Sequence, residues 1–174
     1  LLTADPGAPR KLWDRSTEDR YGHPGTPIST PRPSGRVVRQ AGSNIYLTGV
    51  GASPAGDRPF IDRLDLATFE TERLFRSADD RYEQVIALLS ADGSSLLTRR
   101  ETRTEPPNYY VRNTSSGTSQ PITSFEDPAP QLTGIEKELV TYARADGVQL
   151  SGTLYLPPGY RDGQRVPMVM WAYP

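Results

Sequence analysis

Short apolar runs recur along the chain, and no long stretch repeats apolar residues at the 3.6-residue period of a helix. Gly, Pro, Asp, Asn and Ser bound these runs, which lie at residues 37–38, 45–47, 60–66, 85–89, 96–97 and 109–111. That spacing is typical of successive short antiparallel strands. The sequence therefore predicts a mostly β fold.

Two Asp-Gly pairs mark tight turns within this pattern. Asp92-Gly93 lies between the apolar runs 85–89 and 96–98, and a second pair occupies residues 146–147. Asp-Gly readily adopts the positive φ angles of a two-residue turn. We therefore predict a β-hairpin at each pair.

A charged segment occurs more than once. Residues 15–21 (RSTEDRY) return as residues 76–82 (RSADDRY), and residues 121–125 could be a third, degenerate copy. Strands and tight turns separated by a repeated charged connection describe the blades of a β-propeller. The alternative is a β-sandwich in which two turns happen to look alike.

Two or three blades do not close a ring, because propellers contain about four to eight. An incomplete set would also expose strand edges that favour aggregation. We therefore expect the 174 residues to be a segment of a larger protein.

The pattern changes after the Pro-rich residues 125–130, which read as a linker. Residues 149–156 alternate between apolar and polar side chains, which predicts a half-buried strand. Residues 166–173 are almost continuously apolar, which predicts a strand buried on both faces in a helix-covered sheet.

Composition excludes several classes of function. The net charge of −1 and pI near 5.9 argue against a nucleic-acid binder. The absence of Cys and the single His exclude a thiolate or multi-His metal site within the chain. No apolar run approaches the roughly 18 residues of a membrane helix. The glycines of residues 49–56 lack the spacing of a dinucleotide site, and we expect no cofactor.

The segment 137–174 resembles the start of the peptidase domain in the prolyl oligopeptidase family of serine peptidases, in its glutamyl endopeptidase branch. The resemblance is carried by residues 152–160 (GTLYLPPGY) and 170–174 (MWAYP). Upstream, residues 12–19 (LWDRSTED) and 49–56 (GVGASPAG) are also similar to that branch.

The resemblance implies partial β-propeller blades followed by the first strands of an α/β-hydrolase domain. Residues 1–130 would be the C-terminal blades, and residues 131–174 the linker and N-terminal strands of the hydrolase. The implied activity is peptide-bond hydrolysis through an acyl-enzyme, with Glu before the scissile bond. The implied partners are a peptide substrate and the remainder of the same polypeptide, and the compartment stays open between bacterial and plastid-like locations.

The catalytic triad is expected outside this chain. No Gly-x-Ser-x-Gly nucleophile motif occurs, and in α/β-hydrolases the serine, acid and histidine all follow the early strands. His23 comes too early for this order and reads as a turn histidine. The resemblance implies one catalytic residue, Tyr173, whose hydroxyl would donate to the oxyanion. The alternative is a tyrosine at the end of a strand that packs at the rim of the sheet. The chain alone is therefore predicted to be inactive.

Two alternatives remain open from the sequence. One is a non-catalytic β-propeller that serves as an interaction module, and the other is an aminopeptidase or esterase of the same superfamily. Continuation of the gene into a Gly-x-Ser-x-Gly segment would exclude the first.

Overall fold

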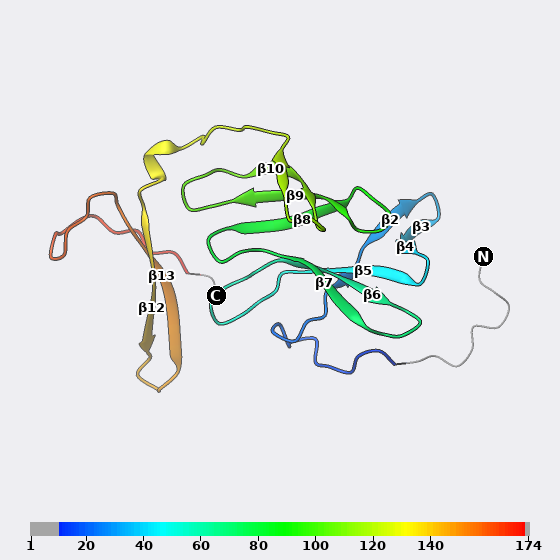
Figure 1. Ribbon diagram of the computed structural model, residues 1–174. Coiled ribbons are helices and arrows are strands. Elements are labelled where there is room, and N and C mark those ends of the chain that lie inside the picture. Colours follow the sequence, from blue (N-terminus) through cyan, green and yellow to red (C-terminus); the bar gives the residue numbers. More distant parts are fainter. Residues whose placement is uncertain (1–10, 173–174) are drawn as a thin grey trace. The chain divides into compact units, whose positions relative to one another are not determined.

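The computed structural model describes residues 11–172, which divide into two compact units at Glu126/Asp127. Strands dominate the described residues, and the only helix among them is the short 3-10 turn Pro130–Leu132 (Figure 1). The prediction of a mostly β fold is therefore confirmed. No helix within residues 11–172 has the length and apolar character needed to cross a membrane.

The first unit contains two antiparallel sheets. The first sheet has the order β1-β5-β6-β7, with β4 also paired to β5, and the second has the order β11-β10-β9-β8. The strands of the first sheet are β1 (Thr26–Pro27), β4 (Gln40–Ala41), β5 (Asn44–Gly49), β6 (Phe60–Asp65) and β7 (Thr71–Arg76). Those of the second are β8 (Tyr82–Leu88), β9 (Ser95–Glu101), β10 (Asn108–Asn113) and β11 (Ser119–Pro121). Each sheet matches one blade of a β-propeller, as predicted.

A small hairpin interrupts the strand beside β5. β1 and β4 pair with the two ends of β5 on the same side, and between them the Ile28 N–H donates to the Tyr46 carbonyl. The Arg39 N–H then donates to the Ile28 carbonyl, which closes the base of the insertion. The inserted hairpin consists of β2 (Ser29–Arg32) and β3 (Gly35–Val38).

The core of the first unit lies between its two sheets. Tyr46 and Ile61 of the first sheet pack with Leu88 and Leu96 of the second, and all four are buried. These residues come from the apolar runs on neighbouring strands, whose alternate positions point to one face of a sheet. Burial of these faces against each other holds the two blades together.

Both predicted hairpins are present. Asp92 and Gly93 lie in the turn between β8 and β9, and Gly93 has a φ of 77°. Gly147, with a φ of 87°, lies in the turn that joins the two strands of the second unit.

The charged repeat lies where one sheet passes to the next. Its second copy, residues 76–82, connects the end of β7 to the start of β8, and residues 121–125 follow from the end of β11. The described copy at residues 15–21 forms turns but no strand. The repeat therefore marks the connections between blades rather than the blades themselves.

The second unit is a two-stranded hairpin of β12 (Glu136–Ala143) and β13 (Gln149–Leu156). The strand predicted at residues 149–156 is confirmed, but it is not half-buried. Leu154 is 37% exposed, and most of its neighbours on both faces are exposed as well. The two strands of the hairpin contact each other only along their edges. Pairing alone therefore leaves both faces of the hairpin exposed.

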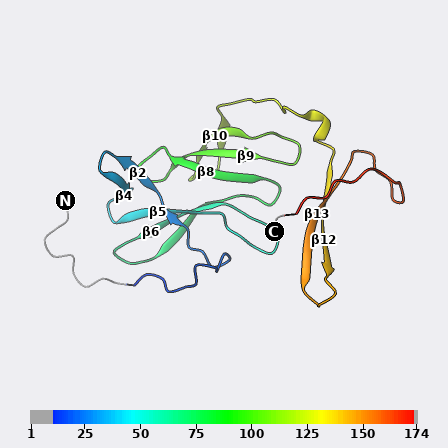
Figure 2. The same ribbon diagram turned by 180° about the vertical axis from the view of Figure 1, so that it is seen from behind.

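The strand predicted over residues 166–173 is not formed within the described part of the chain. Residues 163–172 have no strand partner there, as the ribbon after β13 shows in Figure 2. Val169 is 96% exposed and Met170 84% exposed, so this segment is not buried on either face. A strand needs a neighbour that accepts its backbone hydrogen bonds, and residues 11–172 provide none here.

Candidate functional site

The predicted oxyanion donor, Tyr173, lies outside the described residues. The described side chains just before it, Met168 and Met170, are largely exposed to solvent. The role of Tyr173 therefore stays a prediction. The polar clusters and the pocket described below lie within residues 11–172.

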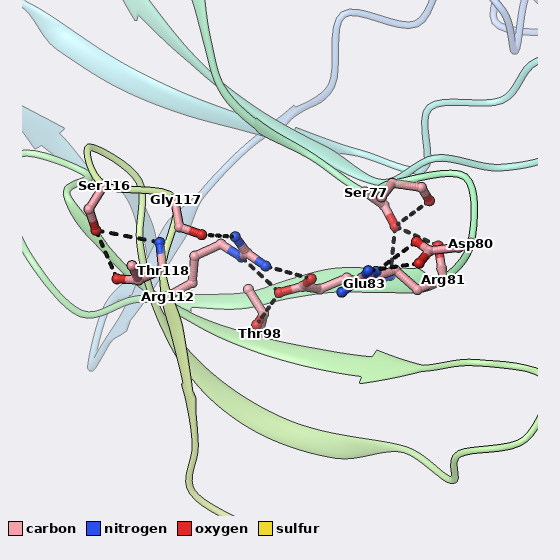
Figure 3. A network of polar contacts seen from close by, with 10 residues as sticks. Ser77, Asp80, Arg81, Glu83, Thr98, Arg112, Ser116, Gly117 and Thr118 are labelled. Carbon is pink, nitrogen blue, oxygen red and sulfur yellow. Dashed lines mark hydrogen bonds and ion pairs between the residues drawn. The ribbon is translucent and has the colours of Figure 1, made fainter.

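The most buried polar arrangement lies on β8, β9 and β10, and Figure 3 shows it from close by. Glu83 is 1% exposed and accepts hydrogen bonds at both carboxylate oxygens. Thr98 Oγ1 and Arg112 Nε donate to its Oε1, each over 2.8 Å, and an Arg112 Nη2–H donates to Oε2 over 2.9 Å. The remaining Nη1 of Arg112 donates to the Gly117 carbonyl.

This arrangement neutralises a buried charge and is not shaped for catalysis. Three donors occupy the carboxylate of Glu83, and a buried ion pair is tolerated only when its hydrogen bonds are satisfied. The Arg112 guanidinium also lies 4.7 Å from the centre of the Phe75 ring of β7. The group therefore joins three strands of one blade and contacts the neighbouring blade.

The charged turn between the blades is organised by Ser77, which is fully buried. Its hydroxyl donates to the Arg81 carbonyl over 2.8 Å and accepts the Glu83 N–H over 2.9 Å (Figure 3). The Arg58 guanidinium donates to the Ser77 carbonyl and pairs with the exposed Asp79. The acidic residues of this turn thus form local ion pairs at the surface, which are worth little individually.

A half-buried His23 lines a small pocket of the first unit, about 270 Å³ in volume. Its Nδ1 accepts the Gly25 N–H over 2.9 Å, so a neutral His23 carries its proton on Nε2. The other lining residues are uncharged: Thr26, Thr48, Gly49, Val50, Pro59, Phe60, Tyr82, Gln84 and Val85. His23 is a turn residue, and no acidic side chain and no serine lines its pocket.

Close packing explains the glycines of residues 49–51. A Cβ on Gly49 would lie 2.6 Å from the Phe60 ring, and one on Gly51 would lie 2.0 Å from the Arg58 carbonyl oxygen. Gly51 also has a φ of 62°. These glycines bring two backbone segments together and do not open a helix, as a dinucleotide site would require.

No set of three or more His, Asp or Glu side chains within residues 11–172 is arranged to hold a metal ion. The polar cluster around Glu83, which sequence reasoning missed, joins residues far apart in the chain, whereas the Ser77 hydroxyl bonds to residues of the charged repeat itself and to the adjacent Glu83. The only sequence signal of the Glu83 cluster is a polar residue at an inward position of a strand, Glu83 in β8.

Comparison with known proteins gives relatives along nearly the whole chain, whereas no protein-family model matches it. A probable chloroplastic glutamyl endopeptidase of Oryza sativa subsp. japonica is 40% identical over 96% of this chain. The corresponding protein of Arabidopsis thaliana is 38% identical over the same share. Among solved structures, oligopeptidase B from Leishmania major gives a TM-score of 0.49 at 8% identity, over 77% of this chain and 21% of its own.

The chain spans about a fifth of the length of these curated relatives, 20% of the rice protein and 19% of the Arabidopsis protein. The shared part contains the motifs on which the resemblance was based, at residues 12–19, 49–56 and 152–160. The chain is thus similar over nearly its whole length to two probable glutamyl endopeptidases, the branch that its motifs resemble.

Proposed function

We propose that this chain is part of a serine endopeptidase that hydrolyses peptide bonds through an acyl-enzyme, with Glu before the scissile bond. The observation that carries this proposal is the 40% identity to a probable glutamyl endopeptidase over 96% of the chain. Two blade-like sheets followed by a linker and a hairpin fit the domain order of a propeller that caps a hydrolase.

The described residues supply positioning rather than chemistry in this proposal. Residues 1–130 contribute propeller blades that restrict access to peptides, and residues 131–174 lead into the hydrolase domain. Tyr173 donates its hydroxyl to the oxyanion, and the rest of the same polypeptide supplies the serine, acid and histidine. A phenol donor at the developing negative charge stabilises the tetrahedral intermediate.

A fluorophosphonate probe applied to the full-length gene product tests the proposal. We expect one serine outside residues 1–174 to be labelled, and the isolated 174-residue chain to remain unlabelled. Cleavage mapping on a peptide library should then place Glu before the scissile bond. Absence of labelling would favour the non-catalytic propeller, and release of single N-terminal amino acids would favour an aminopeptidase.

A further inference from the structure

The β2–β3 hairpin, residues 29–38, occupies an unusual place in its blade. It is inserted into the strand formed by β1 and β4, which lies at the edge of the first sheet and precedes the other strands in sequence (Figure 1). A propeller blade is a four-stranded sheet, and the blades surround a central channel. The β2–β3 hairpin is thus an addition to the edge strand of its blade rather than one of its four strands.

The hairpin lies in a stretch of sequence without acidic residues. The chain has 21 Asp and Glu among 174 residues, yet residues 21–56 contain none. The same stretch contains Arg32, Arg36 and Arg39. Its side chains at neutral pH therefore carry only positive charge.

Neutral groups hold Arg36 and Arg39, so their hydrogen bonds do not compensate their charge. Arg36 donates to the Ser29 Oγ over 2.8 Å and to the Ser29 carbonyl over 3.0 Å. Within the described residues, neither Arg32 nor Arg36 has a carboxylate within ion-pair distance. Some strand arginines of the two sheets behave differently: Arg73 and Arg112, for example, pair with carboxylates.

The hairpin is fixed at its base. Arg39 donates to the Leu88 carbonyl over 2.6 Å and to the Ser90 carbonyl over 3.1 Å, which ties the insertion to the end of β8 in the neighbouring blade. A fixed base lowers the conformational entropy that a ligand must remove on binding. The charges at the tip are thus presented by an ordered element.

Acidic groups of the neighbouring turns are engaged in their own turns. Asp92 accepts hydrogen bonds from the N–H and hydroxyl of Ser94. Asp65 accepts from the Ser43 hydroxyl and the Ala67 N–H. Both carboxylates stabilise the turns in which they lie, and neither forms an ion pair with Arg32 or Arg36.

The tip itself is open. Arg32 and Arg36 are exposed, and they lie on opposite faces of the hairpin because their cross-strand partners are Gly35 and Pro31. A Cβ added to Gly35 would meet no atom within 4 Å. An approaching carboxylate therefore has access to a guanidinium on either face.

We propose that the β2–β3 hairpin is a docking element for an acidic segment of the peptide substrate, remote from the scissile bond. The inference rests on the proposed peptidase function and adds a second recognition site to it. Guanidinium groups bind carboxylates through two parallel N–H···O hydrogen bonds, which neutral side chains do not match.

The test compares two peptides cleaved by the full-length protein. The peptides share the residues around one Glu cleavage site, and their distal segments carry four glutamates in one and four glutamines in the other. We expect the double variant Arg32→Gln/Arg36→Gln to raise KM for the acidic peptide about three- to tenfold, since exposed ion pairs are individually weak. KM for the neutral peptide and kcat for both should stay unchanged, and the KM difference should shrink at high salt.

The matched control is Arg103→Gln, which removes an exposed arginine from the β9–β10 loop of the same unit. Equal effects of the control and the double variant, or equal effects on both peptides, would overturn the proposal.

Fluorescence anisotropy of the labelled acidic peptide separates docking from catalysis. If neither peptide is cleaved, the proposed function fails. Weaker binding of the acidic peptide by the double variant than by the unmodified protein would still support docking at the hairpin. Tighter binding of a single-stranded oligonucleotide than of the acidic peptide would also contradict it.

Discussion

Arg112 compensates a buried negative charge, so its removal should destabilise the second sheet. Replacement by Met leaves the Glu83 carboxylate buried without its cation and without two of its three donors. Breaking a buried ion pair on one side costs roughly 3–5 kcal/mol. We expect Arg112→Met to lower the free energy of unfolding by about this amount. The measurement is the urea midpoint of the first unfolding transition of the full-length protein, which should fall.

A double variant provides the control for the buried charge. Glu83→Gln together with Arg112→Met removes both charges and leaves an amide that can still accept from the Thr98 hydroxyl. We expect this pair to recover a large part of the lost stability, because no unpaired charge remains in the core. Equal midpoints for the single and double variants would show that charge is not the cause.

The turn between β8 and β9 should make stability depend on pH in acid. Hydrogen bonds from Ser90, which has the larger effect, and from Ser94 lower the pKa of Asp92 from its ordinary value of 3.8 to about 2. A carboxylate with a lowered pKa stabilises the folded state above pH 3.8, and this contribution is lost as the pH falls towards 2. We expect Asp92→Asn to reduce the loss of stability between pH 5 and pH 2, measured as the urea midpoint at each pH.

Asn-Gly forms the same tight turns as Asp-Gly, so this substitution keeps the backbone conformation of the hairpin. Ser94→Ala is the companion variant, since it removes a hydroxyl donor to Asp92 and keeps the carboxylate. Its pH profile should lie between those of the unmodified protein and Asp92→Asn. Identical profiles for all three proteins would argue against a contribution from Asp92.

Among the connections between strands, the β5–β6 loop should tolerate no side chain at Gly51, where its two ends approach each other closely. A Cβ there would lie 2.0 Å from the Arg58 carbonyl oxygen, and the φ of 62° is also unfavourable for other residues. Gly42 has a similar φ of 60° with no atom near a Cβ, so Gly42→Ala measures the backbone cost alone. We expect Gly51→Ala to destabilise by about 1–3 kcal/mol more than Gly42→Ala in chemical denaturation. Equal costs would contradict the close packing.

Strands with local signals could be predicted from the sequence, and those without them could not. The apolar runs beside the two Asp-Gly pairs predicted β8, β9 and the β12–β13 hairpin. The apolar pair at residues 37–38 indicated one strand of the inserted hairpin, but its pairing was not predicted, because residues 29–38 contain two prolines and no buried apolar face. Proline is tolerated at sheet edges, and both strands of this hairpin are edges.

The buried cluster of Glu83 and Arg112 could not be predicted from the sequence, because it depends on contacts between residues far apart in the chain. Glu83 and Arg112 are brought together only when β8, β9 and β10 align in register. Residues 166–172 illustrate the opposite case, since their apolar character predicts burial but burial also requires a neighbouring strand. Sequence periodicity reports what a segment can bury and does not report whether a partner is present.

In the full-length protein, the repeat and the length of the relatives both leave room for the domain order that we propose. The repeated charged segment connects two blade-like sheets, and propellers need more blades than these to close. The chain covers about a fifth of its curated relatives, which leaves ample length for further blades and a hydrolase domain. The interpretation of residues 137–174 as the start of that domain is the step that a catalytic variant can test.

Tyr173 is the residue on which this test rests. Replacement by Phe keeps the aromatic ring and removes only the hydroxyl, so an oxyanion donor would be lost without a change in packing. Loss of one oxyanion donor lowers kcat by roughly 10²–10³-fold, and KM should change little because the donor acts on the transition state. Tyr160→Phe in the neighbouring Pro-Pro-Gly-Tyr segment is the matched control and should leave kcat unchanged. An unchanged kcat in Tyr173→Phe of the full-length protein would remove the oxyanion assignment, while labelling of the downstream serine would still support the peptidase.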